Sequence, residues 1–186
     1  MNIIEIIATI STLICVVLAA KEHILSWPIG IISALSLIIL YVDRCMYANI
    51  VLQSVFVIQC IIGWYNWGGV TNIVISSRTI SRLVFDSLLA ISIGMVYGII
   101  LHLYNKNDVL NLNTFLDGIS TMLALLGNWY LTRKIIQAWP LFMTYNIIVA
   151  SLLASHGINL LVVLNICLFF ISLNGLYRWR SKLIEE

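Results

Sequence analysis

Three side chains in the second half of the chain are spaced so that they could hold a flat, positively charged ring. Trp139, Phe142 and Asn146 stand at i, i+3 and i+7, which places them along one face of a helix. An aromatic face attracts a cation without a buried counter-charge, and an amide offers both donors and acceptors. Two alternatives stay open: Trp139 could lie at a membrane headgroup belt, and Asn146 could bond a neighbouring helix.

Further polar groups stand singly in apolar stretches, namely the amides Gln53, Gln59, Asn165 and Asn174 and the carboxylate of Asp117. Such groups are costly against lipid and usually turn inward. The amides could contact a bound molecule or bond neighbouring helices. The carboxylate could complement a cationic ligand, take up a proton, or cap its helix.

Metal and catalytic chemistry find little support. The four cysteines stand alone, without a C-x-x-C pair, and no histidines cluster at ligand spacing. His23, His102 and His156 fall at the ends of apolar stretches, away from a paired serine or acid. The spacing of Arg82 and Asp86 at i, i+4 predicts a surface ion pair. We therefore expect no metal, no cofactor and no enzyme.

The composition places these residues in a membrane. Of 186 residues, 61% are hydrophobic and only 10% charged, with a mean hydropathy of +1.02, against roughly a quarter charged in soluble domains. So few charges cannot cover the surface of a soluble 21.0 kDa chain. The net charge of +2 is too small and too scattered for nucleic-acid binding.

Charged or turn-rich breaks divide the chain into stretches of about 20 mostly apolar residues, the length that a membrane-spanning helix needs. The pattern predicts an all-α integral membrane protein. The first stretch lacks the basic start and the cleavage site of a signal peptide, so we interpret it as a retained span. The seven predicted spans are Ile3–Ala20, Ile24–Val42, Met46–Trp67, Leu83–Leu103, Phe115–Leu131, Ile135–Ser155 and Ile158–Tyr177.

The basic residues indicate an orientation. With seven spans, eight Lys and Arg side chains fall on one side and two, Arg44 and Lys106, on the other. Basic residues collect on the cytoplasmic side. We therefore expect a multi-pass protein of the inner, cytoplasmic membrane, in contact with membrane lipid and with its C-terminus in the cytoplasm.

The chain also repeats itself at an offset of 112 residues. This offset superimposes Trp27-Pro28 on Trp139-Pro140, Gly63 on Gly175, Tyr65 on Tyr177, Trp67 on Trp179 and Gln53 on Asn165. The predicted organisation is 3+1+3: residues 1–67 form one three-helix repeat, 68–114 a linker with the fourth span, and 115–186 the second repeat with a cytoplasmic tail. Parallel repeats of this kind hold substrate between them near mid-membrane. The matched prolines could sit in first helical turns or act as paired hinges.

Several motifs resemble the PnuC family of vitamin transporters. The first half carries Leu18-Ala19-Ala20-Lys21-Glu22, Trp27-Pro28-Ile29-Gly30 and Gly63-Trp64-Tyr65-Asn66-Trp67. The second half carries Asp117, Thr132-Arg133-Lys134, Trp139 with Asn146, and Leu173-Asn174-Gly175 with Trp179. The resemblance covers nearly the whole chain in order.

The resemblance implies a nicotinamide riboside transporter with a fold similar to SWEET sugar transporters. It also implies a homotrimer and facilitated diffusion, with a cytoplasmic kinase trapping the imported vitamin by phosphorylation. The family's W-x-x-W-x-x-x-N signature falls on Trp139, Phe142 and Asn146, with Phe in place of the second Trp. Gln137 stands where the family usually has Glu. Both departures bear on which vitamin is carried, since thiamine and deoxynucleoside transporters belong to the same family.

The sequence thus predicts a substrate site formed by Trp139, Asn146, Phe142, Gln53, Asp117, Trp64, Asn174 and Gln137. The alternatives are transport of thiamine or a deoxynucleoside, or a membrane scaffold without a translocation pathway, in which the embedded amides only hold helices together.

Overall fold

The structure, a computed structural model, describes residues 3–43, 47–69, 73–104, 112–155 and 159–185. These residues form an all-helical protein, as the hydropathy pattern predicts. The seven helices of the described ranges are α1 (Ile3–Ala20), α2 (Ser26–Asp43), α3 (Tyr47–Trp67), α4 (Ile80–Tyr104), α5 (Leu112–Thr132), α6 (Ala138–Ser155) and α7 (Asn159–Glu185). Each predicted span therefore coincides with one helix to within a few residues at most boundaries.

Five of these helices, α1, α3, α4, α6 and α7, are long and apolar enough within the described residues to cross a membrane. The apolar part of α2, Ser26–Val42, falls just short in length. The fifth helix carries Asp117, Ser120, Thr121 and Asn128, which lower its hydropathy. Ser120 and Asn128 are buried, so this helix turns part of its polar surface toward protein rather than lipid.

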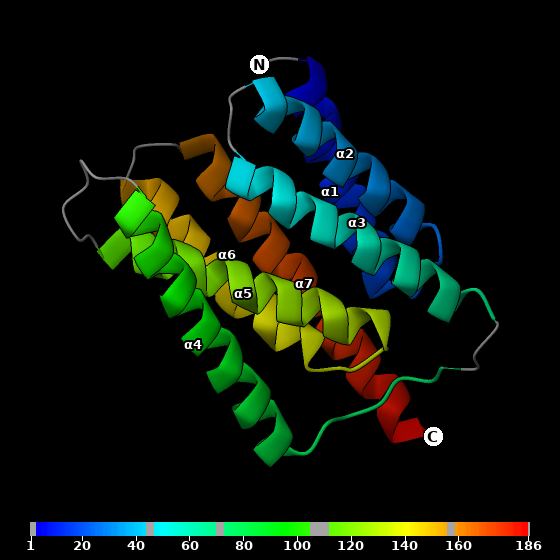
Figure 1. The fold of residues 1–186 in the computed structure, drawn as a ribbon. Helices are drawn as coiled ribbons and strands as arrows, with labels where there is room; N and C mark the ends of the chain where they lie inside the picture. Colours follow the sequence, from blue (N-terminus) through cyan, green and yellow to red (C-terminus); the bar gives the residue numbers. More distant parts are fainter. Residues whose placement is uncertain (1–2, 44–46, 70–72, 105–111, 156–158, 186) are drawn as a thin grey trace.

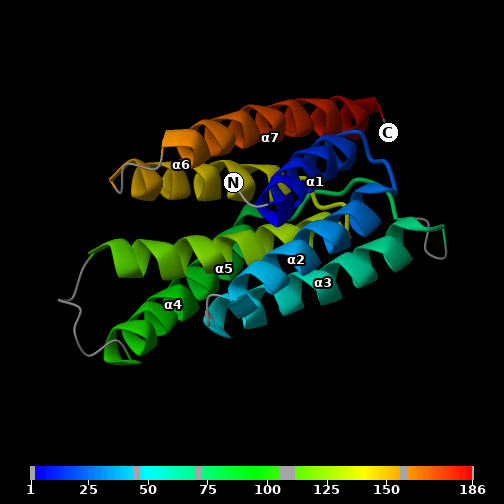
Figure 2. The same cartoon turned by 90° about the horizontal axis from the view of Figure 1, so that it is seen from above.

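The helices form two groups around a shared interior. Figure 1 shows α1, α2 and α3 together on one side of the bundle and α5, α6 and α7 on the other, with α4 at the outer edge beside α5. The groups meet where α1 packs on α7 and where α3 packs on α5. In Figure 2, which views the bundle from above, α7 lies beside α1. These two contacts pair the first helix of each group with the last helix of the other.

Glycines allow α4 to cross α5 at backbone distance. A Cβ atom on Gly94 would lie 2.7 Å from the carbonyl oxygen of Gly118, and one on Gly118 would overlap the carbonyl oxygen of Gly94. At Gly98 the nearest atom, on Phe115, would be 3.2 Å away. The helix crossing therefore tolerates no side chain at its centre and little at its edge.

Replacing Gly118 by alanine should separate α4 from α5, because backbone atoms cannot move aside as a flexible side chain can. We expect the free energy of unfolding to fall by about 1–3 kcal/mol. Thermal unfolding of the detergent-purified protein measures the loss. Gly98→Ala is the graded comparison, and an equal loss in both variants would contradict the close crossing at Gly118.

The turns that follow α1 and α5 are built alike. Glu22 and Lys134, which are 112 residues apart, both adopt positive φ angles, of 56° and 51°. The amide of His23 donates to the Leu18 carbonyl over 2.9 Å, and at the matching positions Ile135 donates to Tyr130 over 2.9 Å. These bonds are the helix-ending pattern in which a left-handed residue satisfies the last free carbonyls.

Several helix boundaries differ from the predicted spans, and two of the differences have a visible cause. The sixth helix begins at Ala138 rather than at Ile135, because Ile135 pairs with Ser76 as an isolated bridge. The last helix continues beyond Tyr177 to Glu185, and its fully buried Trp179 explains the extension. Pro28 and Pro140 are the third residues of α2 and α6, so the first-turn interpretation of both prolines is confirmed.

Four tryptophans join the two groups. Trp27 meets Trp67 edge to face, with ring centroids 5.1 Å apart and planes at 89°, and Trp139 meets Trp179 at 5.3 Å and 89°. Trp67 and Trp179 then contact each other across the two groups at 6.0 Å. The exposed fractions of Trp139 and Trp179 are 0%, so Trp139 is no headgroup anchor.

The predicted ion pair between Arg82 and Asp86 is wrong. Asp86 instead accepts a hydrogen bond of 2.5 Å from the hydroxyl of Tyr130 on α5. Tyr130 is almost fully buried, and a buried hydroxyl needs a partner. This hydrogen bond between helices therefore takes the place of a pair along one helix.

Candidate functional site

A cavity of about 300 Å³ lies between the two groups of helices. Residues from α1, α2, α3, α5, α6 and α7 line it, and none of its lining residues is charged. Uncharged pockets with a few convergent polar groups are typical of small-molecule sites. The helices therefore position a site that both halves of the chain share.

One wall of the cavity belongs to α6. Trp139, Phe142 and Asn146 all line it, as their spacing along one helical face predicts. The rings of Trp139 and Phe142 lie 6.3 Å apart at 64°. Tyr145 also lines this wall, and nothing in its spacing or type distinguishes it beforehand from an ordinary core aromatic. The wall combines three aromatic rings with one amide.

The amide of Asn146 brings to the cavity wall a buried acceptor that no described residue bonds. The exposed fraction of Asn146 is 4%, and its Oδ1 atom has no hydrogen-bond partner among the described residues. A buried acceptor without a partner costs free energy that a ligand donor would recover. The indole Nε1 of Trp139 is likewise buried and without a partner in the described part of the chain.

The opposite wall, on α2, consists of small side chains. Gly30, Ser33 and Ala34 line the cavity there, and the offset of 112 makes them the counterparts of Phe142, Tyr145 and Asn146. The Ser33 hydroxyl lies 2.6 Å from that of Thr12, which also faces the cavity. The two walls thus occupy equivalent positions but differ in bulk, and the space they leave lies against α2.

The embedded amides differ in what they face. Gln53 and Asn165, which are repeat counterparts, both line the cavity. Gln59 bonds one neighbouring helix, α5: its side-chain nitrogen donates to the Leu125 carbonyl over 3.2 Å, and its oxygen accepts from Asn128 over 2.8 Å. Asn128 lines the cavity as well, so this bond fixes a polar group at its edge.

Four predicted site residues lie outside the cavity lining. Trp64 is about half exposed on α3. Asn174 lines a separate pocket between α1 and α7. Asp117 is exposed in the second turn of α5, too far along to be its N-cap. Gln137 precedes α6 and accepts a 3.0 Å bond from the Arg78 amide while donating to Ser77 and Arg78, so it fastens the connection between α3 and α4.

Metal-binding groups are absent where the structure can be described. Across residues 3–43, 47–69, 73–104, 112–155 and 159–185, no three His, Cys, Asp or Glu side chains gather at a metal-binding distance. The cavity offers aromatic faces, amides, hydroxyls and the thiols of Cys15 and Cys60, and such a largely apolar wall with a few polar groups is typical of small-molecule sites.

Comparison with known proteins decides the family. The sequence profile described as "Nicotinamide mononucleotide transporter" matches residues 2–181. The chain belongs to this family. The protein named "Nicotinamide riboside transporter PnuC" of Escherichia coli (strain K12) is 25% identical over 208 residues, which cover 98% of this chain and 87% of that protein. The protein of the same name from Shigella flexneri gives the same figures.

A solved structure agrees in fold. The "Crystal structure of the Vitamin B3 transporter PnuC" superposes with a TM-score of 0.70 over 96% of this chain and 80% of that chain, at 19% identity. The predicted PnuC resemblance is therefore confirmed. The family consists of transporters and not of enzymes. The several apolar helices of this chain, together with its membership in that family, make it a multi-pass membrane protein.

Proposed function

We propose that this protein carries nicotinamide riboside across the membrane by facilitated diffusion, through the cavity between its two halves. The observation that carries the proposal is the α6 wall, where aromatic rings surround a buried amide oxygen without a partner. Membership in a transporter family and the name of the curated relatives support the same substrate.

The chemistry of the substrate fits this wall. Nicotinamide riboside contains a flat pyridinium cation, and the cavity holds no charged side chain to neutralise it. The faces of Trp139 and Phe142 supply that attraction, since cation–π contacts strengthen when they are desolvated. The carboxamide of the substrate is an N–H donor suited to Asn146 Oδ1. The ribose then lies toward the small residues of α2, where Ser33 of α2 and Thr12 of α1 offer hydroxyl oxygens.

We place the site on a pseudo-two-fold axis between two parallel repeats, residues 1–67 and 115–186, joined by a linker of residues 68–114 that contains the fourth span. Such an axis brings repeat counterparts together. Three pairs support it: Glu22 bonds Lys134 over 3.3 Å, Trp67 touches Trp179, and Gln53 and Asn165 line one cavity. This is the 3+1+3 arrangement of seven spans expected from the resemblance to SWEET-like folds.

The proposed orientation places the basic end of the bundle in the cytoplasm. The C-terminal ends of α1, α3, α5 and α7 and the start of α4 lie at one end of the bundle (Figure 1), and the eight basic residues of the predicted inner side lie in or next to them. Arg44 and Lys106, assigned to the other side, lie outside the described residues. The proposal includes the inner cell membrane, a homotrimer and a downstream cytoplasmic kinase, all of which the PnuC resemblance supports.

Transport by purified protein in liposomes tests the proposal. We expect saturable uptake of labelled nicotinamide riboside that stops at equal concentrations on both sides, because facilitated diffusion couples to no gradient. Enclosing a nicotinamide riboside kinase with ATP should raise the total label inside well above that level, and omitting ATP should abolish the excess.

Competing substrates separate the alternatives. Saturable uptake of thiamine or a deoxynucleoside, without uptake of nicotinamide riboside, would identify that compound as the substrate. The changed specificity would then be attributed to Phe142. Absence of uptake for all three would favour the scaffold hypothesis. Uptake that depends on an imposed proton gradient would contradict facilitated diffusion and direct attention to Asp117.

A further inference from the structure

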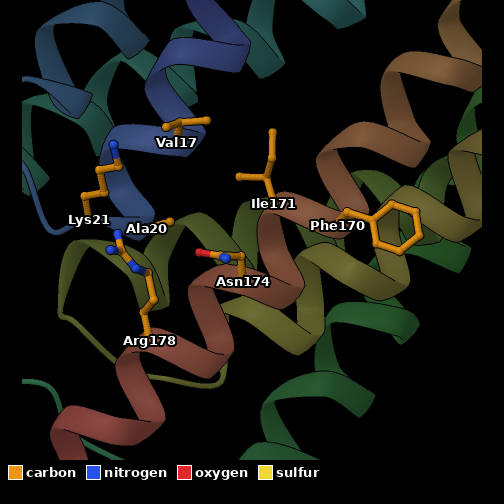
Figure 3. A pocket seen from close by; sticks show the side chains of 7 residues that line it. All are labelled: Val17, Ala20, Lys21, Phe170, Ile171, Asn174 and Arg178. Carbon is orange, nitrogen blue, oxygen red and sulfur yellow. The ribbon is translucent and has the colours of Figure 1, made fainter.

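A second pocket of about 300 Å³ lies between the end of α1 and the part of α7 from Phe170 to Arg178, outside the proposed transport path. Lys21, Asn174 and Arg178 form its polar side, and Val17, Phe170 and Ile171 form its apolar side. Figure 3 shows Asn174 and Arg178 extending from α7 toward the end of α1, where Ala20 and Lys21 lie. The pocket is therefore amphipathic, with its cations at one end.

The two cations of this pocket have no acidic partner among the described residues. The carboxylate next in sequence, Glu22, already pairs with Lys134 and Lys182. Two positive charges that line one concave surface without a counter-charge attract an anion. Among the described residues, no neighbouring side chain supplies that anion.

The other half of the chain shows what a filled version of this pocket looks like. The counterparts of Val17 and Lys21 are Trp129 and Arg133, and there the guanidinium of Arg133 lies 4.3 Å from the centre of the Trp129 ring. The counterpart of Arg178 is Asn66, whose amide donates to the Thr132 carbonyl over 3.2 Å. Between α3 and α5 the protein thus covers the cation itself, whereas between α1 and α7 it does not.

The depth of the pocket identifies its ligand class. The apolar span of α1 ends at Ala20, so Lys21 lies where the hydrocarbon core meets the headgroup layer. Val17 is one turn deeper, and the exposed Phe170 lies two turns before Arg178 on α7. Basic pockets between helices on the cytoplasmic side of a membrane suit anionic headgroups.

We propose that this pocket binds an anionic phospholipid. The headgroup phosphate lies between Lys21 and Arg178, the amide of Asn174 donates to it or to the glycerol oxygens, and an acyl chain follows Val17, Ile171 and Phe170. The neutral headgroup of phosphatidylcholine offers the same acyl chains but no net negative charge. The pocket therefore discriminates by charge at a fixed depth.

Native mass spectrometry of the purified protein, titrated with dioleoyl phosphatidylglycerol or dioleoyl phosphatidylcholine, tests this site. We expect the wild type to retain phosphatidylglycerol preferentially. The double variant Lys21→Gln/Arg178→Gln should lose about thirtyfold in apparent affinity, from two cations near the membrane surface. The double variant Arg82→Gln/Arg180→Gln removes the same charge from exposed positions outside the pocket and should retain binding.

A third variant keeps the test independent of charge and of folding defects. Val17→Trp copies the filled arrangement of the other half and should expel the lipid while leaving both cations in place. Equal losses in the two charge variants, or equal retention of the two lipids by the wild type, would overturn the site. Displacement of phosphatidylglycerol by glycerol phosphate at equal molar concentration would show a soluble-anion site and overturn the lipid assignment.

Discussion

Replacing Asn146 by leucine is expected to weaken nicotinamide riboside binding by about 5- to 150-fold, equivalent to roughly 1–3 kcal/mol. The two side chains have similar size, so the cavity keeps its shape while the buried Oδ1 acceptor disappears. The carboxamide of the substrate would then enter the cavity without its partner, and an unpaired buried donor costs that amount. Isothermal titration calorimetry gives the Kd directly.

The melting temperature of the Asn146→Leu variant without substrate gives a second test of this prediction. Because Asn146 Oδ1 has no partner among the described residues, its removal should leave the melting temperature unchanged or raise it. Thr144→Val, on the exposed side of the same helix, is the matched control and should alter neither quantity. If Asn146→Leu binds like the wild type but melts lower, the amide serves helix packing, and the substrate assignment fails.

Replacing Gly175 by alanine should weaken substrate binding by displacing the cavity wall. A Cβ atom there would lie 2.8 Å from the ring of Trp139, which is fully buried and cannot swing away freely. The ring must shift toward the cavity or α7 must move outward. We expect overpacking to lower the free energy of unfolding by about 1–3 kcal/mol. We expect substrate affinity to fall by more than about tenfold, because a loss of about 1.4 kcal/mol in binding free energy is enough for a tenfold change.

The repeat supplies the matched control. Gly63 meets the ring of Trp27 in the same way, but Trp27 does not line the cavity. Gly63→Ala should therefore lose comparable stability and bind substrate nearly as well as the wild type once folded. Adding Trp139→Phe to Gly175→Ala should restore stability without restoring affinity. Equal binding losses for the two glycine variants would mean that Trp139 acts only as a core residue.

The features that can be predicted from the sequence are those that depend on neighbouring residues along the chain. Apolar stretches of sufficient length, interrupted by charges, locate the helices, since a backbone in lipid must satisfy its own hydrogen bonds. Helical periodicity places Trp139, Phe142 and Asn146 on one face. The offset that pairs Trp27 with Trp139 also indicates where the chain repeats, and the PnuC motifs indicate the family.

Only the packing of the helices shows whether an inward polar group lines the cavity or contacts another helix. Gln53 and Gln59 look alike in sequence, yet the first lines the cavity and the second bonds α5. Gln137 and Asn174 fall in family motifs but lie at a loop contact and in a separate pocket. Hydropathy predicts that a polar group avoids lipid, but it does not predict which helix that group faces.

The α2 wall of the cavity could not be predicted from the sequence for the same reason. Gly30, Ser33 and Ala34 have no chemistry that marks them along the chain, and they matter because they stand opposite the bulky residues of α6. That opposition arises from contacts between helices that are far apart along the chain. Local pattern fixes which helix face carries a side chain, whereas the packing of α1 on α7 and α3 on α5 fixes what that face meets.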